Sequence, residues 1–111
     1  METELINLHE LKSLYGDDSA KELLEMSLSE GRGLIANLKK SVPARDASSV
    51  GADAHQLKGM SATMTMTKVA DLSYKLEQCA KLDTWDGSED LLSNIENCFS
   101  DIENYLKTAL P

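Results

Sequence analysis

The chain has 111 residues, of which 41% are hydrophobic and 27% are charged, so its length suits one soluble globular domain and not two. Its 19 acidic side chains against 11 lysines and arginines give a formal net charge of −8, which argues against a nucleic-acid-binding domain and against docking on an anionic membrane. No apolar run approaches the roughly 20 residues of a membrane-spanning helix, and no signal-peptide pattern opens the chain. The chain has only two cysteines, fewer than secreted domains of this size that need disulfides usually have, so we expect a cytoplasmic protein.

The first predicted element is a short helix. From Leu5 onward the apolar residues follow a helical spacing. Asn7 and Glu10 form a capping pair for this helix, and Gly16 is expected to end it. β-Branched and aromatic residues are sparse in the rest of the chain, and no stretch alternates apolar and polar residues for long, which favours helices throughout.

A long second helix is predicted from the good N-cap residues at positions 17–19 (Asp17, Asp18 and Ser19) to about Lys40, and Pro43 then ends the pattern. Gly31 and Gly33 lie inside this helix, where each lowers helix propensity by up to ~1 kcal/mol relative to alanine. They either allow close packing or mark a bend, and both explanations stay open. The expected inward residues are Ala20, Leu23, Leu24, Ser27, Leu34, Ile35 and Leu38.

The third helix is predicted from near Asp46 to about Met64, and a fourth follows closely with Thr65 or Thr67 as its cap. Apolar and small residues at helical spacing form a narrow seam in the third helix and line one side of the fourth. These inward residues are Val50, Ala54, Leu57, Ser61 and Met64, followed by Val69, Leu72, Leu76 and Cys79.

A loop containing Trp85 and Gly87 leads to the fifth helix, for which Asp86 and Glu89 are the expected capping pair. Short connections between long amphipathic helices favour antiparallel neighbours. The predicted fold class is therefore all-α, an antiparallel up-and-down four-helix bundle with a short additional N-terminal helix, forming a single domain over residues 1–111. The inward residues of the fifth helix are expected to be Leu91, Leu92, Ile95, Cys98, Phe99, Ile102, Tyr105 and Leu106.

Charge is distributed unevenly along the chain. Residues 1–30 carry −6, residues 31–81 carry +4 and residues 82–111 carry −6, which together give the total of −8. The basic middle segment is either chance scatter over solvated helix faces or a docking surface for an acidic partner, whose complementary field would speed association. Its bases are Arg32, Lys39, Lys40, Arg45, Lys58, Lys68, Lys75 and Lys81.

His55 does not fit the packing pattern of the third helix. It follows the inward residue Ala54 and is therefore turned ~100° away from the apolar seam. Lys58 adds a positive charge one turn later, and an exposed imidazole beside an ammonium can act as a nucleophile and carry an anion. The other neighbours at helical spacing are small and would leave the ring open to another protein, although Gly59 has the alternative role of allowing tight contact between helices. These small residues are Gly51, Ala52, Gly59 and Ala62.

The run from Ala54 to Ala62, Ala-His-Gln-Leu-Lys-Gly-Met-Ser-Ala, resembles the signature of histidine-containing phosphotransfer (HPt) domains. The resemblance extends to Asp46, which lies nine residues before the histidine, and to the residues 17, 21 and 22 positions after it, Leu72, Leu76 and Glu77. HPt domains are four-helix bundles with a short extra helix, and they relay phosphoryl groups in multistep phosphorelays. Their order and length of helices match most of this chain.

The sequence departs from the HPt pattern at two places. Thr65-Met66 stands where the family commonly has Gly-Ala between the third and fourth helices, so we expect a changed turn geometry with the fold retained. Met60 replaces the small polar residue that usually follows the glycine, and it either belongs to the core or to the rim of a docking surface.

The resemblance implies that His55 attacks a receiver domain's phosphoaspartate through Nε2 and returns the phosphoryl group to another receiver. Lys58 would offset the charge of the phosphoryl oxygens, and Gly59 with its small neighbours would give clearance for the receiver's loops. Glu77 would accept a hydrogen bond from the other ring nitrogen and set the tautomer. The receiver would bring Mg²⁺, so the chain itself is expected to be a phosphocarrier without metal or cofactor, and not an enzyme.

The implied partners are a response-regulator receiver domain and a hybrid histidine kinase, and we expect a monomer that binds neither nucleic acid nor membrane. Two other functions stay open: a helical adaptor that binds a receiver or kinase without accepting phosphate, and a metal-binding bundle with ligands converging on His55.

His9 is expected at the surface. Cys79 and Cys98 are expected to be buried thiols in a reducing cytoplasm. Met1 and the compact length favour a free-standing protein.

Overall fold

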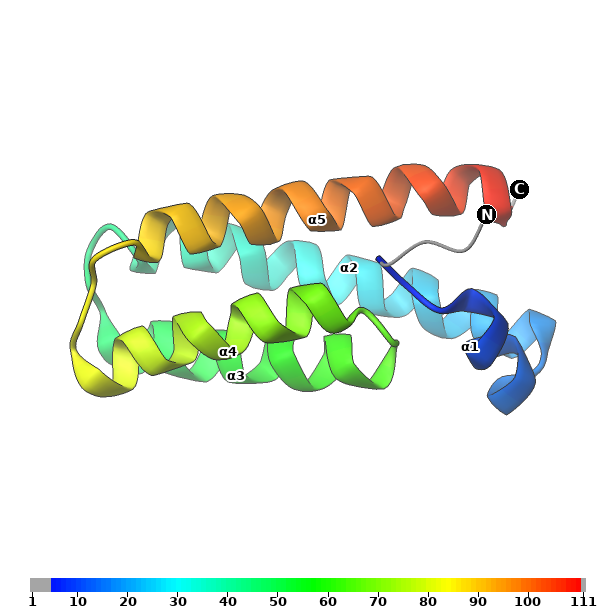
Figure 1. Ribbon diagram of the computed structural model, residues 1–111, viewed down its shortest axis with the longest axis horizontal. Coiled ribbons are helices and arrows are strands. Elements are labelled where there is room, and N and C mark those ends of the chain that lie inside the picture. Colours follow the sequence, from blue (N-terminus) through cyan, green and yellow to red (C-terminus); the bar gives the residue numbers. More distant parts are fainter. Residues whose placement is uncertain (1–4, 111) are drawn as a thin grey trace.

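The computed structural model describes residues 5–110, and within that range the chain forms five helices (Figure 1). Helix α1 spans Leu8–Tyr15, α2 spans Asp17–Ser41, α3 spans Ala47–Thr63, α4 spans Thr67–Leu82 and α5 spans Ser88–Ala109. Helices α2 to α5 run alternately in opposite directions, and α1 lies against one end of α2 (Figure 1). The predicted all-α, up-and-down four-helix bundle with a short N-terminal helix is confirmed.

Two of the predicted helix starts are confirmed, and a side chain caps each of them. The Asn7 side chain accepts a hydrogen bond from the Glu10 backbone N–H at 3.0 Å and begins α1. The Asp46 side chain accepts from the Ser49 N–H at 3.2 Å and begins α3. The end of α1 is also as expected, because Gly16 adopts a φ of +84°, which glycine tolerates at no steric cost.

The remaining predicted caps are wrong. Gly16 ends α1 and is also the N-cap of α2, so Asp17 is already helical and contributes its charge to the first turn. Gly87 is the N-cap of α5 and enters the helix with a φ of +79°, which leaves Asp86 one residue too early to cap it. Met66 is the N-cap of α4, and no side chain makes a capping hydrogen bond there.

Thr65 has a different role from the predicted helix cap. Its φ of +61° is in the left-handed region, which is uncommon for a β-branched residue. Its hydroxyl oxygen accepts a hydrogen bond from the Asn7 backbone N–H at 2.9 Å and lies 3.3 Å from the Asn7 carbonyl oxygen. Thr65 therefore connects the turn between α3 and α4 to the segment that enters α1.

The core is an apolar layer to which every helix contributes, as the periodicity predicts. Phe99, Leu38, Leu57, Leu76 and Ile102 are completely buried within it. Several predicted inward residues lie only at its edge, namely Leu23, Leu72, Leu91 and Tyr105. Both cysteines are free thiols, and Cys98 is buried as expected, whereas Cys79 is only half-buried.

Gly31 and Gly33 differ sharply in their surroundings. A Cβ atom added to Gly31 would lie 2.4 Å from Cζ of the buried Phe99 ring, so α2 needs a glycine there to approach α5. A Cβ atom added to Gly33 would meet nothing within 4 Å. Close packing therefore explains Gly31 and does not explain Gly33.

The α3–α4 hairpin is shorter than the two helices on which it packs. Helices α3 and α4 have 17 and 16 residues, whereas α2 and α5 have 25 and 22. Figure 1 shows α2 extending past the turn of the hairpin, with α1 lying against the extension. None of the helices in residues 5–110 has the length and apolar character needed to cross a membrane.

Candidate functional site

His55 lies at the surface of α3 because the seam of that helix is narrow. Ala54 and Leu57 on either side of it in sequence are completely buried, and the rotation of ~100° per residue turns His55 outward. Its side chain is 67% exposed, so the ring is accessible to another protein. The prediction that His55 faces away from the core is confirmed.

The imidazole of His55 is connected to α4 through Glu77. The Nδ1 atom of His55 lies 2.9 Å from Oε2 of Glu77, and the two residues are 22 positions apart in sequence. The second carboxylate oxygen, Oε1, lies 3.1 Å from Nζ of Lys58. One carboxylate from α4 therefore contacts two cationic or ionisable side chains of α3, one through each oxygen.

Glu77 is ionised in this arrangement. Partial burial of its carboxyl group raises its pKa, but the ion pair with Lys58 and the hydrogen bond with His55 outweigh that effect and hold the pKa of Glu77 below its ordinary value. A carboxylate can only accept hydrogen bonds, so the ring nitrogen that faces it carries the proton.

The other ring nitrogen of His55 is left available. Among residues 5–110 no side chain or backbone group makes a hydrogen bond to Nε2. In a neutral ring whose proton is on Nδ1, Nε2 carries the free electron pair and is the nucleophilic atom. The contact with Glu77 thus fixes both the ring's tautomer and its orientation.

The small residues around His55 are not equivalent. Ala52, Gly59 and Ala62 are exposed, and a Cβ atom added to Gly59 would meet nothing within 4 Å. Tight contact between helices therefore does not explain Gly59. Gly51 is half-buried, and its added Cβ would make an ordinary contact of 3.8 Å with Ala80 of α4.

Tyr74 belongs to this cluster and was not predicted from the sequence. It lies one turn before Glu77 on α4, and Nζ of Lys58 is 5.2 Å from the centroid of its ring. The separation of three residues between Tyr74 and Glu77 is the signal that places both on one helix face. That spacing points to Tyr74 as a site residue only once it is known that the Lys58 side chain extends from α3 to contact α4.

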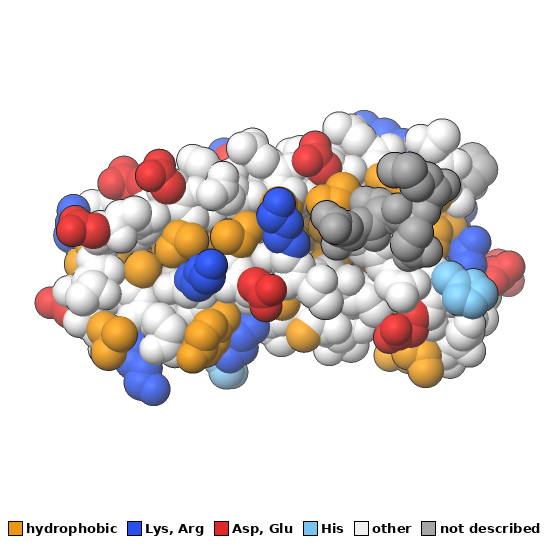
Figure 2. All heavy atoms as spheres, in the orientation of Figure 1, with side chains coloured by type: hydrophobic (Ala, Val, Ile, Leu, Met, Phe, Trp, Pro, Cys, Tyr) orange, Lys and Arg blue, Asp and Glu red, His pale blue; other side chains and the backbone are white. Residues whose placement is uncertain are grey.

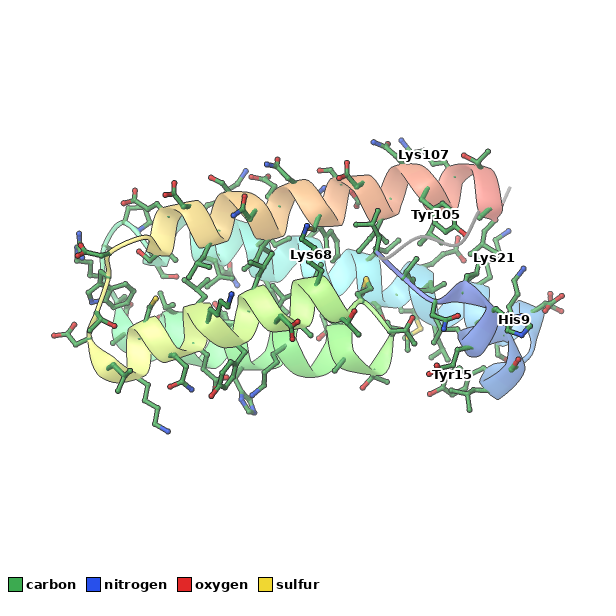
Figure 3. All side chains as sticks on the ribbon, viewed as in Figure 1. His9, Tyr15, Lys21, Lys68, Tyr105 and Lys107 are labelled. Atoms are coloured by element: carbon green, nitrogen blue, oxygen red, sulfur yellow. The ribbon has the colours of Figure 1, made fainter. Side chains whose placement is uncertain are left out.

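The basic segment at residues 31–81 does not form one surface. Arg32 is turned toward α5, where its Nε is 3.1 Å from Glu103 and its Nη1 is 3.6 Å from Glu96. Lys39 also pairs with Glu96, at 2.6 Å. Figure 3 shows Lys68 at the junction of α4 and α5. Bases close in sequence are therefore directed to different sides of the bundle, which favours scatter over solvated helix faces, the first of the two explanations.

The face of the molecule seen in Figure 2 has acidic, basic and apolar side chains interspersed, with a broken line of hydrophobic atoms along the α4–α5 junction. His9 lies at the α1 end of the molecule and is exposed, as predicted (Figure 3).

In the described part of the chain no three His, Cys, Asp or Glu side chains come together as a metal site would require. The metal-binding alternative therefore has no ligand set there.

Comparisons with known proteins agree with this fold. The family model described as Hpt domain matches residues 22–105. Among solved structures, histidine-containing phosphotransfer protein B (HptB) from Pseudomonas aeruginosa PAO1 matches with a TM-score of 0.87 and 21% sequence identity, covering 97% of this chain and 96% of that one. A search of curated proteins gave no match. The family match includes α3 and α4 in full, and the structural match shows a shared fold.

Proposed function

The chain belongs to the Hpt domain family, and on that premise we propose that His55 receives a phosphoryl group from one receiver-domain aspartate and passes it to another. Members of this family are phosphocarriers in phosphorelay signalling, so the chain has a histidine phosphotransfer role. The observation that carries the proposal is an exposed imidazole whose Nδ1 is held by Glu77, which leaves Nε2 free.

In the proposed step, the electron pair on Nε2 attacks the phosphorus of the phosphoaspartate. The new N–P bond forms as the bond from phosphorus to the aspartate oxygen breaks, and the aspartate leaves as a carboxylate. The proton on Nδ1 stays in its hydrogen bond with Glu77, whose negative charge balances the positive charge that the ring acquires. Return of the group to a second receiver is the same step in reverse.

The other site residues support this chemistry by charge and by space. Lys58 places an ammonium one turn from His55, where it offsets the negative phosphoryl oxygens. Gly59, Ala52 and Ala62 leave the surface beside the ring free of bulky side chains, and Gly51 contributes at its half-buried edge. We assign the Mg²⁺ and most of the catalytic groups to the receiver, and the phosphate source upstream to a hybrid histidine kinase.

The experiment compares two histidine variants. The purified chain is incubated with a panel of phosphorylated receiver domains, and transfer of label to the chain is followed with tests of acid and base stability. We expect a label that is lost in acid and retained in base, as for a phosphorus–nitrogen bond. His55→Gln should abolish labelling, whereas His9→Gln, which changes the exposed histidine on α1, should label at the wild-type rate.

Both variants change exposed side chains, so circular dichroism should show an unchanged helical fold and stability should change by no more than about 0.5 kcal/mol. A His55→Gln chain that still takes label would show that the acceptor is wrongly assigned. A wild-type chain that binds the receivers but never takes label would instead support the adaptor function.

A further inference from the structure

We propose that Tyr74 is a positioning residue for phosphoryl transfer, because its ring keeps the Lys58 ammonium beside His55. The inference rests on the proposed function of His55. Tyr74 lies on α4 and Lys58 on α3, so the contact joins the same two helices as the pair of His55 and Glu77.

Lys58 is held more closely than an ordinary surface lysine. Its side chain is only 32% exposed, and its Nζ atom contacts both Oε1 of Glu77, at 3.1 Å, and the Tyr74 ring, at 5.2 Å from the centroid. A lysine free in solvent samples many rotamers and keeps its ammonium in water. Two contacts from α4 restrict this ammonium to the side of α3 that carries His55.

Glu77 alone does not account for a stable position of Lys58 throughout the transfer. Its Oε2 atom is already committed to Nδ1 of His55. When a phosphoryl group is attached to Nε2, its oxygens compete with Glu77 for the ammonium, because both are anionic acceptors. The face of an aromatic ring attracts a cation whichever anion the cation pairs with. Tyr74 therefore keeps Lys58 in place while its anionic partner changes, and the neutral ring adds no negative charge to the site.

The ring of Tyr74 is 48% exposed, so direct contact with an incoming receiver is a competing explanation that the experiment must separate. We would compare Tyr74→Leu, Tyr74→Phe, Lys58→Met and the double variant of Tyr74→Leu with Lys58→Met. Transfer from a phosphorylated receiver and the lifetime of the phosphorylated chain are measured for each. Proton NMR of the Lys58 ε-methylene in the unphosphorylated chain reports the ring contact independently of any transfer.

We expect Tyr74→Leu to slow transfer roughly two- to fivefold, the size that an exposed cation–π contact supports, and Tyr74→Phe to stay close to wild type because it keeps a ring. In the Lys58→Met background, Tyr74→Leu should have no further effect. The upfield ring-current shift of the Lys58 ε-methylene should be present in wild type and in Tyr74→Phe, and absent in Tyr74→Leu.

If Tyr74→Leu reduced the transfer rate equally in the wild-type and Lys58→Met backgrounds, the proposal would be overturned, since Tyr74 would then act on the receiver directly. Absence of a ring-current shift in wild type would overturn it as well. If wild type takes no label from any receiver, the proposed function of His55 fails, while the NMR measurement still decides whether Tyr74 positions Lys58.

Discussion

Replacing Gly31 with alanine should destabilise the bundle although alanine is the better helix former. The new Cβ atom would lie 2.4 Å from Cζ and 2.8 Å from Cε1 of Phe99, whereas unstrained carbon atoms approach to about 3.5–4.0 Å. The helix or the ring must therefore move by about 1 Å, and Phe99 is completely buried among core residues. Such overpacking costs about 1–3 kcal/mol, against which the gain in helix propensity of up to ~1 kcal/mol is small.

Gly33 provides the matched control, because it lies two residues away in the same helix and is exposed. Its added Cβ atom meets nothing within 4 Å, so the only effect of Gly33→Ala should be the higher helix propensity of alanine, which raises stability by up to ~1 kcal/mol. Urea denaturation of wild type and both variants gives the free energies of unfolding. An unchanged slope of the unfolding free energy against urea concentration would show that the unfolded state is not altered.

We expect the two variants to move in opposite directions, with the unfolding midpoint falling for Gly31→Ala and rising for Gly33→Ala. Equal stabilisation by both alanines would refute the reasoning, because it would mean that α2 and α5 separate freely at Phe99. A loss for both would instead contradict the open surroundings of Gly33.

Two further predictions concern the site. Gly59→Gln should keep or raise the melting temperature, because the new side chain enters open space. The same variant should transfer phosphate more slowly, because its side chain obstructs the receiver. Melting temperature and transfer rate are measured on the same sample, and a lowered melting temperature or a normal transfer rate would contradict the clearance role. The lowered pKa of Glu77 means that its ionised form stabilises the fold above the ordinary glutamate pKa of about 4.3, and that this contribution is lost as pH falls through the lower folded value. The difference in unfolding free energy between wild type and Glu77→Gln should therefore shrink on acidification, and urea titrations that give a constant difference across that range would disprove the coupling.

Much of the fold follows from local features of the sequence. The helix periodicity, the cap at Asn7 and the start of the third helix near Asp46 depend on residues within one turn of each other, so they could be recognised without knowledge of distant contacts. The predicted caps at Thr67 and Asp86 failed because the backbone enters those helices through Met66 and Gly87, whose side chains make no capping hydrogen bond. The choice between these neighbouring residues depends on tertiary packing of the turns.

The site was predictable to the extent that it lies on one helix face. The exposure of His55 followed from the position of Ala54, and the contact with Glu77 followed from the resemblance to HPt domains. The contact between Lys58 and Tyr74 was missed because it links two helices through a flexible side chain. The separate explanations of the two glycines in α2 were also beyond local reasoning, since Phe99 is 68 residues from Gly31.

The unequal lengths of the helices separate the molecule into two regions with different tolerance to change. Helix α2 exceeds α3 by eight residues, 25 against 17, which is about 12 Å of helix at 1.5 Å per residue. Along that extension α1 packs against α2, and Thr65 lies at the border between the two regions, where it bonds to Asn7 (Figure 1). His55 and Glu77 lie on α3 and α4, outside the extension. We therefore expect substitutions in the α1 region to alter stability without moving these two side chains, which makes the extension the region to engineer at least cost to the proposed phosphoryl transfer.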